Sequence, residues 1–206
     1  MRLRYNAPVT LTFALISAVV LILDQTLVPG IITSLFTAES SVTFKLDDFP
    51  SYIRLITHVF GHDSWEHLLS NLTLILLLGP ILEEKHGSRA VLLMMFITAA
   101  VNGITNALFF ETELLGASGI VFMMILLISF VNIKPGEIPI TLILVIGLYL
   151  LKEIMNIFKE DDISQISHII GGACGCVFGF SKRFSEKRKN NASSPQPQPG
   201  GQTIVS

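Results

Sequence analysis

Long apolar runs separated by short polar connections dominate this chain. They predict membrane-spanning helices at approximately 9–27, 66–83, 88–110, 114–133, 137–158 and 163–181. A run of about 20 apolar residues is long enough to cross the ~30 Å hydrocarbon core of a bilayer as a helix. The pattern therefore predicts an all-α integral membrane protein, a bundle of six transmembrane helices within residues 1–184.

Two segments depart from this pattern. Residues 28–65 form a connection between the first and second helices that is far longer than the other loops. Its mixture of apolar residues with Asp47, Arg54 and His58 predicts a long outer loop that lies along the membrane surface. The tail, 185–206, is polar and rich in Pro, Gly and Gln, so we expect it to be a disordered cytoplasmic segment.

Composition agrees with a membrane protein and narrows the partners. Charged residues make up 15% of the chain, against about 25% in soluble domains. The net charge of −2 gives no positive surface that would attract nucleic acid. The expected partner is the lipid bilayer that surrounds the predicted spans. Cys174 and Cys176 lie in one apolar run, and no Cys/His cluster has zinc spacing. We expect neither a metal nor a cofactor.

The basic residues predict the orientation. With the N-terminus in the cytoplasm, the outer segments contain only Lys45, Arg54 and Lys159, with Lys152 near an outer helix end. Such a positive-inside bias places both termini in the cytoplasm. The basic start before Val9 could also belong to a signal peptide, but no small-residue cleavage site follows, which favours a retained first helix. The short chain without a targeting extension favours a prokaryotic cell membrane. The inner segments hold the other ten basic residues: Arg2, Arg4, Lys85, Arg89, Lys134, Lys182, Arg183, Lys187, Arg188 and Lys189.

Polar groups inside a span are costly and are functional candidates by default. Ser118 lies five residues past Glu113, roughly 7–8 Å below the outer edge at ~1.5 Å per residue, and His168 lies about 9 Å past Asp162 by the same rise. His67 and Asn71 begin the second helix at a comparable level, on one helix face. Three helices thus place polar groups in one shallow layer.

Small residues indicate which helices meet. His168 shares a helix face with Gly171, Gly175 and Gly179, and the fourth helix offers Gly116-Ala117-Ser118-Gly119. Glycine surfaces let helix backbones approach closely, which would bring the Ser118 hydroxyl near the His168 ring.

This pairing suggests acyl-transfer chemistry. A serine hydroxyl needs a neighbouring base, and histidine is suited to that role near neutral pH. His67, the Asn71 amide and backbone N–H groups around Ser118 are candidate donors to an oxyanion. Because no acidic residue is well placed behind His168, we expect a Ser/His dyad rather than a triad.

The motifs resemble those of the rhomboid intramembrane proteases. His62-x4-His67-x3-Asn71, then Gly116-Ala117-Ser118-Gly119 and then His168-x2-Gly171 match that family's signatures in order. The resemblance covers residues 50–182. It implies a six-helix fold with a water-filled cavity that opens outward. It also implies cofactor-free cleavage of transmembrane substrates near their outer ends, with small residues at the cleaved position.

Other positions match the family in part. Arg54 matches the arginine of the family's Trp-Arg pair, but Ile53 replaces the tryptophan. Phe122 stands where relatives often carry a tyrosine, and its ring could still hold the imidazole by packing. Glu83 resembles a structural glutamate of the family.

Less specific interpretations exist for the same residues. Ser118 could be a small packing residue, and His168 could be a hydrogen-bonding group between helices. At the level of the whole chain, the alternatives are a non-catalytic rhomboid-like module that binds membrane helices and a small transporter. The absence of internal repeats disfavours the transporter.

Overall fold

The computed structural model describes residues 5–130 and 162–193, together with single helical positions at 140, 143, 144, 147, 148 and 151. From 162 onward it describes side chains only over 166–181. Apart from those single positions, the predicted fifth span, 137–158, lies outside the described residues. The same holds for the tail from 194.

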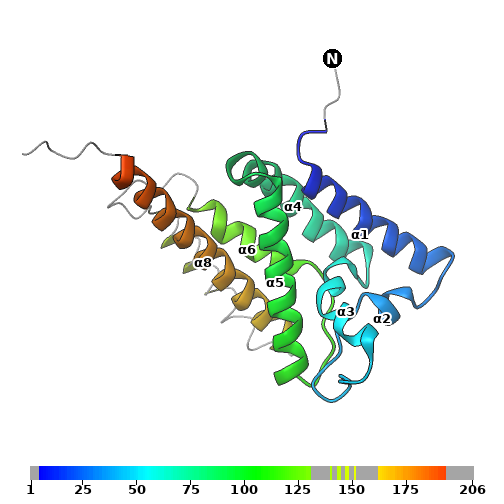
Figure 1. The fold of residues 1–206 in the computed structure, drawn as a ribbon. Coiled ribbons are helices and arrows are strands. Elements are labelled where there is room, and N and C mark those ends of the chain that lie inside the picture. The colour runs from blue at the N-terminus through cyan, green and yellow to red at the C-terminus, as the bar shows by residue number, and fades with distance from the viewer. Residues whose placement is uncertain are drawn as a thin grey trace, which may run out of the picture.

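The described part of the chain is helical (Figure 1). The only extended pairing in it is an isolated antiparallel bridge between Ala38 and Leu114. The helices are α1 (Pro8–Thr26), α2 (Ile31–Leu35), α3 (Phe49–Thr57), the 3₁₀ turn η1 (His58–Phe60), α4 (Trp65–His86), α5 (Ser88–Phe109), α6 (Ser118–Ile128) and α8 (Asp162–Ser193).

Three of these helices are long and apolar enough to cross a membrane. They are α1, α4 and α5, and they lie where the apolar runs 9–27, 66–83 and 88–110 predict spans. The membrane class of the chain is therefore confirmed. α6 and the apolar part of α8, Ile166–Ser181, are shorter.

Several helix boundaries differ from the sequence prediction, and two of these differences concern the site and the tail. α6 begins at Ser118 rather than near 114, because Leu114 pairs with Ala38 and Gly116 has a φ of +107°, outside the helical region. α8 continues to Ser193, into the segment for which we expected disorder. Its Glu, Lys and Arg residues are good helix formers, and extending an existing helix needs no new nucleus.

α6 forms the centre of the bundle. It packs against α4, α5 and α8, and Ile120, Met123, Met124 and Leu127 are fully buried. A helix that is apolar on all sides suits either a protein core or a bilayer, and here neighbouring helices bury it. The start of α6 therefore lies inside the bundle, and Ser118 lies there with it.

A carboxylate on α4 holds the start of α1. The Glu83 side chain is buried, and its Oε1 accepts hydrogen bonds from the Thr10 N–H and the Thr10 hydroxyl, both at 2.7 Å. Its Oε2 accepts from the Val9 N–H at 3.3 Å. Residue Ala7 cannot cap α1 with its side chain, so Glu83 satisfies N–H groups that a helix start otherwise leaves unpaired.

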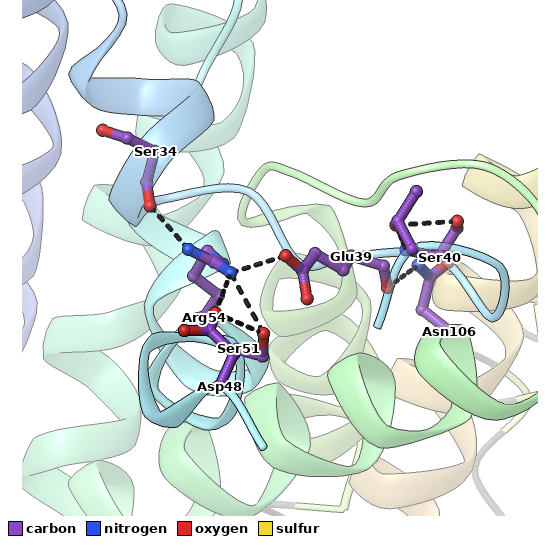
Figure 2. A network of polar contacts seen from close by, with 8 residues as sticks. Ser34, Glu39, Ser40, Asp48, Ser51, Arg54 and Asn106 are labelled. Atoms are coloured by element: carbon purple, nitrogen blue, oxygen red, sulfur yellow. Dashed lines mark hydrogen bonds and ion pairs between the residues drawn. The ribbon is translucent and has the colours of Figure 1, made fainter. Parts of the chain in front are cut away.

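Arg54 organises the connection between α1 and α4 (Figure 2). Its guanidinium donates to the Ser34 carbonyl at 3.0 Å, to Asp48 at 3.0 Å and to the Glu39 carboxylate. Hydrogen bonding from Ser51 and the charge of Arg54 lower the pKa of Asp48, against the effect of burial. One side chain thus joins three parts of the connection.

The same connection holds the loop that leads into α6. The backbones of Ala38 and Leu114 exchange hydrogen bonds of 2.8 and 3.0 Å. The Asn106 amide donates to the carbonyls of Glu39 and Thr112, as Figure 2 shows in part. These contacts fix the chain on the approach to Ser118.

Candidate active site

Ser118 occupies the first residue of the central helix. Its side chain is half-buried, and the preceding Ala117 is fully buried. The N–H groups in the first turn of a helix have no acceptor within that helix, and together with the helix dipole they favour negative charge. The N–H groups of Ser118 and Gly119 are therefore available beside the Ser118 hydroxyl.

His168 lies against the same helix, one turn further along. Its ring and that of Phe122 have centroids 4.2 Å apart with an interplanar angle of 39°, and His168 is 8% exposed. Phe122 follows Ser118 by four residues, so the two side chains lie on one face of α6. The imidazole of α8 is thus held on the face of α6 that carries Ser118.

Glycines bring these two helices into backbone contact. A Cβ added at Gly171 would overlap the Gly119 carbonyl, and one at Gly175 would overlap the Met123 carbonyl. A Cβ at Gly179 would meet the Phe130 ring at 2.5 Å. The glycine stripe predicted for this helix therefore faces α6.

Two side chains of α4 face the loop before Ser118. An added Cβ at Gly116 would lie 2.7 Å from His67 Nε2 and 3.9 Å from Asn71 Nδ2. Gly116 itself has a positive φ of 107° and donates its N–H to the His58 carbonyl at 3.0 Å. Only glycine fits both constraints, because any side chain would displace the His67 ring.

Buried His62 fixes the orientation of the Asn71 amide. His62 Nε2 lies 3.1 Å from Asn71 Nδ2, and His62 Nδ1 lies 3.3 Å from the Phe60 carbonyl. Burial, helped by the nearby His67, lowers the pKa of His62 to about 4, so the ring is neutral near pH 7. Its Nδ1–H then donates to Phe60 while Nε2 accepts from Asn71, which leaves the second amide N–H of Asn71 available.

His67 is held from the opposite side. Its Nδ1 lies 3.0 Å from the Asp63 carboxylate, and its backbone N–H donates to the Ser64 hydroxyl that caps α4. Partial burial acts to raise the pKa of Asp63, but hydrogen bonds from His67 and Ser64 outweigh it and the pKa is lowered. With Nδ1 engaged in this way, Nε2 points to Gly116.

A small cavity beside Ser118 contains two polar residues that we did not predict as site residues. It is also lined by Gly116 and Ser167, and its volume of about 10 Å³ is near the minimum for one water molecule. His58 Nδ1 and Asn102 Oδ1 are buried and have no hydrogen-bond partner within the described part of the chain. The presence of Asn102 inside a span was the available signal for this residue.

Acid pH is expected to destabilise the fold through buried histidines. Burial lowers the pKa of His58 from 6.5 to about 4, as it does for His62. Because an unfolded histidine titrates near 6.5, the unfolded chain binds more protons between about pH 6.5 and 4. The free energy of unfolding is therefore highest above about pH 6.5. It falls by roughly 3 kcal/mol per histidine as the pH drops to about 4.

Thermal unfolding in detergent, followed by Trp65 fluorescence, measures this effect. His58→Gln should reduce the fall in Tm between pH 6.5 and 4 relative to the unaltered chain. An equal fall in His58→Gln and the unaltered chain would contradict a buried, neutral His58.

The fold and this geometry define a helical membrane protein whose polar site is formed by α4, α6 and α8. The chain matches the model of the Rhomboid domain over residues 50–183. Because this match covers more than half of the chain, the protein belongs to the rhomboid family, as its motifs predict. It is 23% identical over 146 residues to "Rhomboid-like protein 11, chloroplastic" of Arabidopsis thaliana, a match that covers 63% of this chain. The matched region spans about half, 52%, of that relative.

Proposed function

We propose that this rhomboid-family protein is an intramembrane serine endopeptidase with Ser118 as nucleophile and His168 as general base. The observation that carries the proposal is the packing of the His168 ring on Phe122, one turn from Ser118. The backbone contact between Gly171 and Gly119 supports it, because it keeps α8 close to the start of α6.

Acylation follows from these roles. The Ser118 oxygen attacks the scissile carbonyl carbon while His168 takes the hydroxyl proton. The negative charge that forms on the carbonyl oxygen is stabilised by the Ser118 N–H and the Asn71 amide. His67 Nε2 adds a third donor only in the form of the ring that carries a proton on both nitrogens, because Nδ1 already donates to the Asp63 carboxylate. Each such donor typically contributes about 3–4 kcal/mol to lowering the barrier. The C–N bond then breaks, and the leaving amine takes the proton from His168.

Deacylation needs one water molecule. Water attacks the acyl carbon, passes a proton to His168 and releases the acid, and the Ser118 oxygen recovers that proton. The cavity beside Ser118 has room for about one water, and the unpartnered atoms of His58 and Asn102 are suited to bind it. We infer that this cavity supplies the hydrolytic water.

The proposed substrates are membrane proteins cut within a transmembrane segment near its outer end. Small residues at the cleaved position suit the tight surroundings of Ser118, where the adjoining cavity has a volume of only about 10 Å³. We also propose that both termini lie on the cytoplasmic side, as the positive-inside bias of the sequence supports.

Covalent labelling tests the proposed nucleophile. The purified protein in detergent is incubated with a fluorophosphonate probe, which reacts with activated serine hydroxyls. Labelling is expected for the unaltered chain, with complete loss in Ser118→Ala. Ser129→Ala is the matched control, since Ser129 lies at the other end of α6 and its hydroxyl bonds within that helix.

The outcome separates an enzyme from a binding module. Labelling that persists in Ser118→Ala would assign the reactivity to another serine. Absence of labelling, while a soluble serine hydrolase reacts in the same buffer, would favour a non-catalytic module that binds membrane helices.

A further inference from the structure

An apolar groove lies between α1 and α5, on the far side of Ile120 from Ser118. Its volume is about 380 Å³, within the usual range for ligand pockets. One wall runs along α1 from Pro8 to Ile16, the other along α5 from Leu92 to Ala99, and Val59 and Phe60 of η1 close its end. We propose that this groove binds one acyl chain of a phospholipid whose phosphate contacts Arg89.

The position of the groove selects a lipid. Both long walls belong to helices that can span a membrane, so its mouth opens to hydrocarbon rather than to water. At the mouth, the side chains of Ile16, Leu92 and Phe96 are 40–55% exposed. They extend the apolar outer surface of α1 and α5, which faces lipid. The one hydroxyl in the lining, on Thr12, is bonded to the Tyr5 hydroxyl at 2.9 Å.

Size separates an acyl chain from a helix. An α-helix with side chains is about 10 Å wide, so 380 Å³ would hold only about one turn of it. The α1 wall is roughly 12 Å long at 1.5 Å per residue, close to half of the ~30 Å hydrocarbon core. The groove therefore matches one chain from a single leaflet, the leaflet in which α1 and α5 begin.

Charge at the mouth identifies the head group. Arg89 is exposed and precedes Leu92 by three residues and Phe96 by seven, which places it on the face of α5 that lines the groove. It stands in the first turn of α5, at the membrane surface. A guanidinium there can bind a phosphate through two parallel hydrogen bonds.

The groove shares two wall residues with the cavity beside Ser118. Val59 and Ile120 line both, and the residue before Val59 accepts the Gly116 N–H through its carbonyl. A bound acyl chain thus packs on residues that support the start of α6. We expect added phospholipid to raise the Tm of the protein in detergent.

Native mass spectrometry in a mild detergent tests the site without using activity. The probe lipid is dioleoyl phosphatidylglycerol, and dioleoylglycerol, which has the same chains but no phosphate, is the comparison. The unaltered chain should retain the phospholipid and bind the diacylglycerol more weakly. Ala99→Leu, which fills the groove, should abolish retention, whereas the neighbouring Ala100→Leu should not.

A second pair of variants tests the phosphate contact. Arg89→Gln should weaken phospholipid binding by about tenfold, the loss expected for one charge-assisted interaction, and Lys85→Gln should leave it unchanged. Should Ala99→Leu fail to fold, Thr12→Leu at the exposed mouth fills the same space.

Three results would overturn the proposal. The first is that a groove-filling variant retains as much phospholipid as the unaltered chain does. That variant is Ala99→Leu or, should Ala99→Leu not fold, Thr12→Leu. The second is equal affinity for the two probe lipids. The third is a dimer that disappears in the groove-filling variant, which would assign the groove to a second copy of the chain. None of these measurements depends on catalysis. A negative result would therefore refute the lipid site without bearing on the proposed protease function.

Discussion

His168→Ala should lower kcat for cleavage of a transmembrane substrate by on the order of 10⁴- to 10⁶-fold, with little change in KM. The reason is that, in the proposed mechanism, Ser118 would lose the group that takes its proton, while the surfaces that bind substrate remain. The loss should appear as a defect in the chemical step, because the base acts only as the hydroxyl attacks. Single-turnover cleavage in proteoliposomes, with enzyme in excess, measures that step directly.

The control for this variant lies next to it in sequence. Ile169 is 47% exposed, so Ile169→Ala should retain activity. Truncation of His168 also removes its packing on Phe122, and an unchanged Tm in His168→Ala would separate lost chemistry from lost structure. Turnover within tenfold of the unaltered chain, in a folded His168→Ala, would refute the role of base.

Gly171→Val should destabilise the protein by about 3 kcal/mol and lower its cleavage rate by at least 10²-fold. The added side chain would overlap the Gly119 carbonyl, a backbone group that cannot rotate aside. α8 must then move away from α6 and take His168 with it. A displacement of about 1 Å in a catalytic group is enough for a 10²-fold loss.

Ala173→Val on the same helix is the matched control. Ala173 is exposed. Ala173→Val should therefore change Tm and the cleavage rate much less than Gly171→Val does. If Gly171→Val and Ala173→Val behaved alike in both measurements, the close approach of α8 to α6 would not be what positions the imidazole.

The local sequence was sufficient to predict α1, α4 and α5. Their apolar runs are long enough to span a bilayer, and hydropathy is a property of each segment alone. The Ser118 and His168 motifs likewise identified the rhomboid family, which the match over 50–183 confirms. Whether the Ser118 hydroxyl bonds the His168 ring stays a prediction.

The start of α6 could not be predicted in the same way. Leu114 and Leu115 continue the apolar run, so hydropathy extends the helix to about 114. The contact of Leu114 with Ala38, distant in sequence, removes these residues from the helix. Pairing between remote segments is a tertiary property, and together with the positive φ of Gly116 it decided that Ser118 begins α6.

The roles of several polar residues also depended on tertiary structure. Glu83 reads in sequence as a charge near a helix end, but the structure makes it the cap of α1. His58 and Asn102 belong to different elements and meet only in the cavity beside Ser118.

The sequence by itself determined that α1, α4 and α5 are long and apolar enough to span a membrane and that the chain carries the rhomboid motifs, since both are local properties of the sequence. Only the tertiary structure decided which faces of the helices meet. Helix rotation and close approach are set by packing among segments far apart in the chain, as the contact between Gly119 and Gly171 illustrates.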